Sequence, residues 1–215
     1  MTPIHNYVAD PFATRLMRIF AIVISVIAVL FVSVAPQGAN DFWLQAKVGE
    51  LIANDHYIPT TLLFPFTEIR SEHFNAHEWL PSVVFYFLIK LFSEDALPLV
   101  LGFGGLVLFS LTASLAYRRG GKNVGTALIF GLIAIGVENY RHTLRPELFS
   151  LFLLCIFLHL LENLKNRPTT ATWLAIALTA ITWANTHGSF ILAPIISGIF
   201  SVGVWADKRR SANDS

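Results

Sequence analysis

Residues 19–35 have the sequence IFAIVISVIAVLFVSVA, which contains no charged side chain. A helix that crosses the hydrocarbon core of a bilayer needs about 20 mostly apolar residues. The flanking Arg15 and Arg18 would also suit a signal peptide, but this run is longer than the roughly 7–15 apolar residues of such a signal. We therefore expect an uncleaved first span over residues 16–35.

The composition of the whole chain favours an integral membrane protein. Hydrophobic residues make up 54% of its 215 residues and charged residues only 13%, with a mean hydropathy of +0.60. A soluble domain carries about 25% charged residues, so this chain cannot cover itself with charge. No basic stripe with interleaved aromatic residues is present, and no nucleic-acid partner is expected. Cys155 is the single cysteine, which excludes an internal disulfide and indicates a packing role.

Further apolar segments predict an all-α bundle of about six spans in one transmembrane domain, residues 1–206. The candidate spans are 16–35, 97–117, 123–138, 147–164, 170–186 and 189–206. Cytoplasmic loops are enriched in lysine and arginine. With both termini cytoplasmic, four groups of basic residues fall on the cytoplasmic side, at 15–18, 118–122, 165–167 and 208–210, whereas Arg141 and Arg145 fall on the outer side against this rule. Residues 36–96 then form an outer loop, and the polar tail 207–215 is expected to be cytoplasmic and disordered.

Two shorter helices are expected within the outer loop. The first covers residues 42–54, where apolar side chains recur at helical spacing. These side chains are Leu44, Val48, Leu51 and Ile52. Residues 78–92 are apolar enough to insert, and a full span there would reverse the topology of everything downstream. The shortness of this segment, with Trp79 and Tyr86, favours a helix in the outer membrane interface.

Polar residues gather in four clusters that this topology brings to the outer face. The clusters are residues 40–43, 75–79, 141–147 and 183–188. Ionisable groups beside hydrocarbon are energetically expensive, so they are rare there unless they pair with one another or carry function. The four clusters are therefore predicted to form a functional site.

Asp41, His77 and Glu78 each have a structural and a functional interpretation. Asp41 would serve as the N-cap of the amphipathic helix, or as a general base or ligand of a divalent cation such as Mg or Mn. Glu78 in a first helical turn would complement the helix dipole. His77 beside Glu78 could instead bind an acceptor or a metal, although the HExxH spacing is absent.

Arg141, His142 and Arg145 are the best ligand candidates. Pro146 suits the first position of a helix, and a residue before proline is driven to extended geometry, so Arg145 should project from the loop. Guanidinium groups bind phosphate in a bidentate manner, and a helix N-terminus adds free N–H donors. The alternatives are headgroup snorkelling and an ion pair with a neighbouring glutamate.

His187 lies in a tight connection between two spans. A neutral histidine both donates and accepts hydrogen bonds, so His187 could contact a sugar hydroxyl. Turn chemistry is the alternative, with Gly188 as the C-terminal cap of one helix and Ser189 as the N-cap of the next.

The ordered series of motifs resembles bacterial multi-pass proteins of the GT-C glycosyltransferase superfamily. The series comprises DFW at 41–43, GELI at 49–52, IP at 58–59, FPFT at 64–67, HEWL at 77–80, RPELFS at 145–150 and WANTHG at 183–188. The resemblance implies an enzyme of the bacterial inner membrane that takes sugar from a polyprenyl-phosphate carrier at the outer face. It also implies an essential acidic residue in the first outer loop, which Asp41 matches, and membrane-parallel helices there.

Such enzymes usually have more than six spans, so a short or truncated member of the superfamily is expected. The leading hypothesis is sugar transfer, with Asp41 as the base or divalent-ion ligand and the arginines neutralising the leaving phosphate. His77, Glu78 and His187 would then orient the sugar or the acceptor. The competing hypotheses are a non-catalytic membrane protein that binds a carrier lipid or a partner subunit, and a small transporter.

Overall fold

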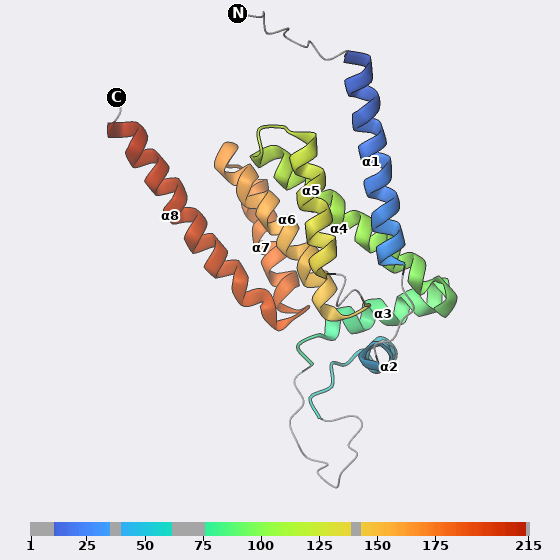
Figure 1. Cartoon of the computed structure of the whole chain (residues 1–215). Coiled ribbons are helices and arrows are strands. Elements are labelled where there is room, and N and C mark those ends of the chain that lie inside the picture. The colour runs from blue at the N-terminus through green and yellow to red at the C-terminus, as the bar shows by residue number, and fades with distance from the viewer. Residues whose placement is uncertain (1–10, 35–39, 62–75, 139–142, 214–215) are drawn as a thin grey trace, which may run out of the picture. The chain divides into compact units, whose positions relative to one another are not determined.

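The computed structural model describes residues 11–34, 40–61, 76–138 and 143–213, and over these residues the chain is all-α, as the sequence predicts (Figure 1). The α-helices are α1 Pro11–Ser33, α2 Asn40–Asp55, α3 Trp79–Phe92, α4 Leu97–Arg119, α5 Val124–Glu138, α6 Pro146–Asn166, α7 Thr170–Ala184 and α8 Leu192–Asn213. Two short 3-10 helices, η1 Glu94–Ala96 and η3 Gly188–Ile191, precede α4 and α8.

Each of the six predicted spans forms a helix, and four of them are long and apolar enough to cross a membrane. These four are Thr14–Ser33, Glu94–Arg119, Pro146–Asn166 and Gly188–Ala212. Helices α5 and α7 have 15 residues each. At 1.5 Å per residue they extend about 22 Å, less than the roughly 30 Å of a bilayer core. The chain is therefore a helical membrane protein in which two of the six predicted spans, α5 and α7, are shorter than the bilayer core.

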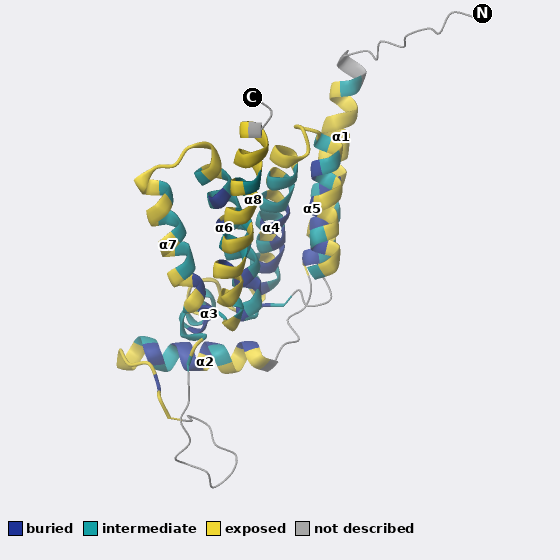
Figure 2. Ribbon diagram, turned by 90° about the vertical axis from the view of Figure 1, so that its left-hand side faces the viewer, coloured by how far each residue is buried: buried dark blue, intermediate teal, exposed yellow. Residues whose placement is uncertain are grey.

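Contacts divide the chain into two compact units. The first comprises Met1–Val34 and Gly102–Arg141, and the second comprises Ala35–Leu101 and His142–Ser215. In the first unit α1 packs along α5, burying Val29 on α1 and Ile135 on α5 (Figure 2). Much of the apolar surface of α1 is exposed and suits contact with lipid.

In the second unit, α2 and α3 make the most extensive helix–helix contact. They contribute Phe42, Ala46 and Phe85 to a core that also contains Leu97 and Leu101 at the start of α4 and Leu144 and Leu148 at the start of α6. The predicted apolar stripe of α2 is only partly correct, because Val48 and Ile52 are buried whereas Leu44 is 53% exposed. The reason is the position of Gly49, which lies on the same face of α2 as Phe42. Because glycine has no side chain, the backbones of α2 and α3 can approach closely at Ser82, and this face packs against α3.

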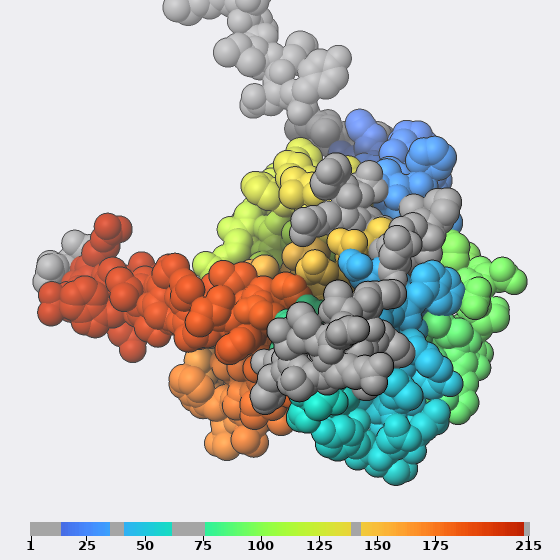
Figure 3. Space-filling model, turned by 90° about the horizontal axis from the view of Figure 1, so that it is seen from below, coloured from blue at the N-terminus to red at the C-terminus, as the bar shows by residue number. Residues whose placement is uncertain are grey.

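A second core joins α6, α7 and α8 through Phe157, Leu161, Trp183 and Ala193. Figure 3 shows α8 extending away from the other helices of its unit, with much of its surface uncovered. Helix α8 continues to Asn213, so the prediction of disorder from residue 207 onward is wrong for residues 207–213. An ion pair of 3.0 Å between Lys165 Nζ and Asp207 Oδ2 ties this polar end to α6.

Candidate functional site

Asp41 and Arg145, from two of the predicted polar clusters, form an ion pair. Arg145 Nη2 lies 2.8 Å from Asp41 Oδ2. Arg145 has extended backbone geometry (φ −132°, ψ 158°) and precedes Pro146 at the start of α6, as the sequence predicts. The proline thereby directs the guanidinium away from the helix and toward α2. The observed partner of Arg145 is thus Asp41 on α2, which the predicted alternative of an ion pair with a neighbouring glutamate did not include.

The ion pair is open to solvent on its acidic side. The Asp41 side chain is 64% exposed, whereas that of Arg145 is 32% exposed. Arg145 Nε is buried and makes no hydrogen bond within the described part of the chain. A guanidinium has five N–H donors, so the contact with Asp41 leaves capacity for a further acceptor. An exposed carboxylate beside this cation can accept a proton or a hydrogen bond from a ligand.

Asp41 lies within the first turn of α2 and not at its cap, because α2 begins at Asn40. A carboxylate in that position complements the positive end of the helix dipole. Its ion pair with Arg145 adds a long-range contact that the sequence-based N-cap interpretation does not contain.

Glu78 is the centre of a second cluster. Its Oε1 lies 3.7 Å from His77 Nε2 and 3.7 Å from His187 Nε2. Its Oε2 accepts a 2.9 Å hydrogen bond from Gln45 Nε2, and the Gln45 amide oxygen accepts a hydrogen bond from Ser82 Oγ. Three segments that are far apart in the sequence therefore hold one carboxylate, whose side chain is only 22% exposed.

Gln45 joins α2 to the Glu78 cluster, and sequence reasoning missed it. Gln45 and Asp41 are one helical turn apart on α2, so their side chains lie on one face of that helix. The available signal was a glutamine beside the buried Phe42 and Ala46, where an apolar residue is expected. A partly buried amide in such a place needs a polar partner.

His187 directs its Nε2 atom toward Glu78. Its Nδ1 accepts a hydrogen bond from the Ser189 backbone N–H (3.1 Å) and contacts Ser189 Oγ (3.0 Å). Ser189 Oγ in turn accepts a hydrogen bond from Trp183 Nε1 at 3.1 Å. A neutral ring that accepts at Nδ1 carries its proton on Nε2, and Nε2 is the atom directed at Glu78.

The connection around His187 differs from the predicted turn. Asn185, and not Gly188, is the C-cap of α7, and the His187 side chain, not that of Ser189, caps the following helix η3. The reason is a contact with α3, because Asn185 Oδ1 accepts a 2.9 Å hydrogen bond from Trp79 Nε1. The Leu80 backbone N–H also donates to the Asn185 carbonyl at 3.4 Å.

Two substitutions of His187 are expected to distinguish how much its cap of η3 and its contact with Glu78 each contribute to stability. His187→Ala removes the side-chain cap of η3 and should lower the free energy of unfolding by about 1 kcal/mol. His187→Asn supplies a new cap acceptor but cannot reach Glu78, so it should regain most of that stability. Thermal unfolding of the purified variants in detergent checks this. Equal losses in both variants would mean that the contact with Glu78, and not the cap, stabilises this connection.

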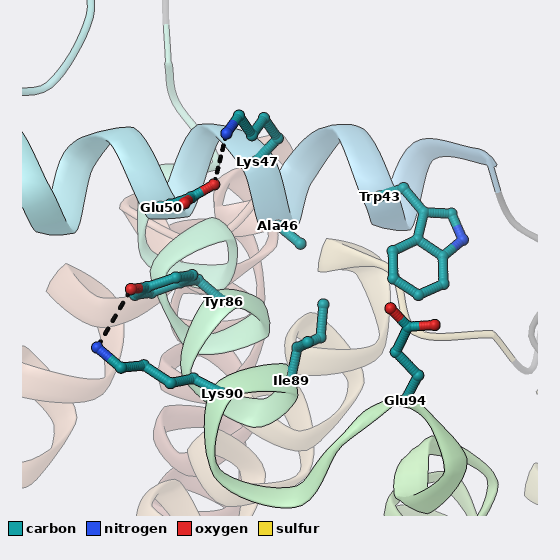
Figure 4. A pocket seen from close by; sticks show the side chains of 8 residues that line it. All are labelled: Trp43, Ala46, Lys47, Glu50, Tyr86, Ile89, Lys90 and Glu94. Atoms are coloured by element: carbon teal, nitrogen blue, oxygen red, sulfur yellow. Dashed lines mark hydrogen bonds and ion pairs between the residues drawn. The ribbon is translucent and has the colours of Figure 1, made fainter.

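A groove lies between α2 and α3 on another side of α2 (Figure 4). It has a volume of about 450 Å³ and is lined by Trp43, Ala46, Lys47, Glu50, Tyr86, Ile89, Lys90 and Glu94. Lys47 Nζ pairs with Glu50 Oε2 at 2.6 Å, and Lys90 Nζ contacts the Tyr86 hydroxyl at 3.3 Å. By helical periodicity Trp43 and Lys47 are directed away from Asp41, so this groove is separate from the Asp41–Arg145 pair.

The remaining predicted site residues are Arg141 and His142, which lie outside the described residues, as does the FPFT motif at 64–67. Within the described ranges, no group of three or more histidine, cysteine or acidic side chains is arranged to hold a metal ion.

The fold and the site define a multi-helix membrane protein with a paired acid and arginine beside a histidine–glutamate cluster. No protein-family model matches the sequence, and no curated protein or solved structure shows significant similarity to it.

Proposed function

We propose that this protein is a membrane glycosyltransferase of the GT-C type. It would transfer a sugar from a polyprenyl-phosphate carrier to an acceptor at the outer face of a bacterial inner membrane, with both termini cytoplasmic. The observation that carries the proposal is the 2.8 Å ion pair between Asp41 and Arg145. These residues belong to two of the motifs that resemble GT-C glycosyltransferases, and they are about a hundred residues apart in the sequence. A sugar transferase with a phosphate leaving group needs a carboxylate base and a cation close together.

In this mechanism Arg145 binds the carrier phosphate. Negative charge develops on that phosphate as its bond to the sugar breaks, and a guanidinium placed there stabilises the transition state. Asp41 takes the proton of the acceptor hydroxyl as the new bond from that oxygen to the sugar forms. The electron pair of the broken bond stays on the phosphate, so charge and atoms balance.

The Glu78 cluster has a positioning role in the proposal. Glu78 accepts hydrogen bonds, and the neutral His187 presents Nε2–H beside it. Sugars and alcohol acceptors carry hydroxyl groups that donate and accept in this manner. His77, which is more exposed than Glu78, would contact the same ligand from the solvent side. Arg141 and His142 are proposed to assist Arg145 at the phosphate.

Arg145→Ala is expected to weaken binding of a short polyprenyl phosphate by about tenfold or more, because a hydrogen bond to a charged group contributes about 1.5–3 kcal/mol. Native mass spectrometry of the full chain with increasing lipid phosphate measures this affinity. Arg167→Ala, at the opposite end of α6, is the matched control and should bind like the wild type. Unchanged affinity in Arg145→Ala would reduce Arg145 to a structural partner of Asp41.

The ion pair also favours a second candidate, a non-catalytic protein that binds the carrier lipid or a partner subunit. In such a protein the one role of the Asp41 carboxylate would be to hold the Arg145 guanidinium in place through the ion pair. This candidate predicts the same loss of lipid binding in Arg145→Ala, but no turnover in the wild type. Sugar transfer therefore distinguishes the two functions.

A further inference from the structure

In the first unit, a pocket lies between the first half of α1 and the connection from α4 to α5. It has a volume of about 460 Å³. Arg18 from α1 and Lys122 from the connection line it, together with apolar residues such as Met17 and Leu128. Figure 2 shows α1 and α5 side by side, as their contacts also indicate. The pocket is thus formed by two helices and a turn that belong to the same compact unit.

The charge of this pocket is positive. Among the described residues that line it none is acidic, and neither Arg18 nor Lys122 forms an ion pair with another described residue. Asn123, which also lines the pocket, uses its side-chain oxygen to accept a hydrogen bond from the Thr126 backbone N–H at 3.1 Å. Two cations that share one cavity repel each other unless an anion lies between them. The pocket therefore has the charge of a phosphate site.

The backbone of Lys122 adds an independent observation. Gly121 and Lys122 both have left-handed conformations, with φ of 66° and 63°. Gly121 suits this geometry, and the Lys122 N–H completes the end of α4 by donating to the Tyr117 carbonyl at 3.0 Å. Lysine at a left-handed position carries strain that glycine would avoid. Glycine at this position would therefore remove the Lys122 charge and keep the turn that ends α4.

The apolar surroundings identify the class of anion. On α1, Met17 is 66% exposed, and Leu16, Ile19 and Phe20 are exposed beside it. This helix is long and apolar enough to cross a membrane, so Arg18 and Lys122 lie at the end of a hydrocarbon-facing surface. A ligand that satisfies both the cations and this surface must combine a phosphate with acyl chains. Basic pockets between membrane helices bind anionic lipid headgroups in this way.

We propose that this pocket binds the headgroup of an anionic phospholipid, with Arg18 and Lys122 contacting its phosphate. The site belongs to the first unit, whereas the Asp41–Arg145 pair belongs to the second. The inference therefore does not depend on the proposed transferase activity.

The test measures lipid retained on the full chain by native mass spectrometry. Phosphatidylglycerol and phosphatidylcholine with identical acyl chains are the probes. The wild type should retain phosphatidylglycerol preferentially. Lys122→Gly should reduce that retention about fivefold, the factor expected from one basic residue near an anionic lipid surface. It should not lower the unfolding temperature in phosphatidylcholine, because glycine relieves the left-handed strain.

Arg18→Gln should reduce phosphatidylglycerol retention in the same direction, and it provides a second readout should Lys122→Gly alter the turn. Lys208→Gln is the matched control, because Lys208 is an exposed lysine near the end of α8 and lines no part of the pocket. Equal retention of the two lipids by the wild type would overturn the proposal. So would an equal loss in Lys208→Gln, which would indicate diffuse attraction to the membrane surface.

Discussion

Replacing Gly49 with alanine is expected to destabilise the second unit by about 2 kcal/mol or more, the range of overpacked cores. A Cβ atom on Gly49 would fall inside the van der Waals contact of the Ser82 backbone carbonyl on α3. A carbonyl in a helix cannot rotate away as a side chain can, so α2 and α3 would have to separate. Helix propensity predicts the opposite sign, because alanine is favoured over glycine by about 1 kcal/mol in a helix.

Thermal unfolding in detergent measures this effect, and the expected loss corresponds to roughly 4–8 °C. Gly198→Ala is the control, because Gly198 lies in α8 of the same unit and an added Cβ meets nothing within 4 Å. The control should be neutral or slightly stabilising. If both variants unfold at the wild-type temperature, α2 and α3 do not pack through Gly49.

Asp41→Asn is expected to reduce sugar transfer by at least about a hundredfold, the lower end of what a general base contributes. Asparagine has nearly the same size as aspartate and still accepts a hydrogen bond from Arg145, but it cannot take a proton. Affinity for the carrier should therefore change little. The initial rate of transfer and the binding of polyprenyl phosphate, measured on the same preparation, separate the two effects.

Asp55→Asn is the matched control for this variant. Asp55 is an exposed aspartate at the last position of α2, far along the same helix from Asp41. It should transfer sugar at the wild-type rate. Full activity in Asp41→Asn would remove Asp41 from the chemistry and leave it as the partner that orients Arg145.

Local features of the fold could be predicted from the sequence because their causes are local. Apolar segments separated by charged or proline-containing connections indicate where the helices lie, and α2 and α3 match the expected segments 42–54 and 78–92 closely. Pro146 alone predicts the extended geometry of Arg145, since a proline ring excludes the helical region for the residue before it. The observed φ of −132° confirms that prediction.

Long-range partners could not be predicted, because they depend on how the helices pack. The distance of 3.7 Å between Glu78 and His187 joins residues more than a hundred positions apart, and each residue has a sufficient local explanation. The role of Gly49 depends on the register of α2 against α3. Asn185 ends α7 because its side chain also accepts a hydrogen bond from Trp79, a contact with α3 that no local turn rule contains.

Polar composition misled the prediction at the end of the chain. Residues from 207 onward carry charges and small polar side chains, which usually indicates a solvated tail. One tertiary contact, the ion pair of Asp207 with Lys165, and one contact within α8, the stacking of Arg209 4.0 Å from the ring centre of Trp205, stabilise the helix in this region. Charged residues that follow a span can thus continue its helix when some of them form such contacts.

The most direct measurement is sugar transfer by the purified full chain in liposomes that contain a labelled polyprenyl-phosphate sugar and a panel of acceptors supplied at the outer face. The Asp41–Arg145 pair predicts label on an acceptor in the wild type and a loss of at least about a hundredfold in Asp41→Asn. Tight carrier binding without any transfer would contradict the enzyme and support the carrier-binding protein. Equal transfer by the wild type and Asp41→Asn would contradict the catalytic role of Asp41.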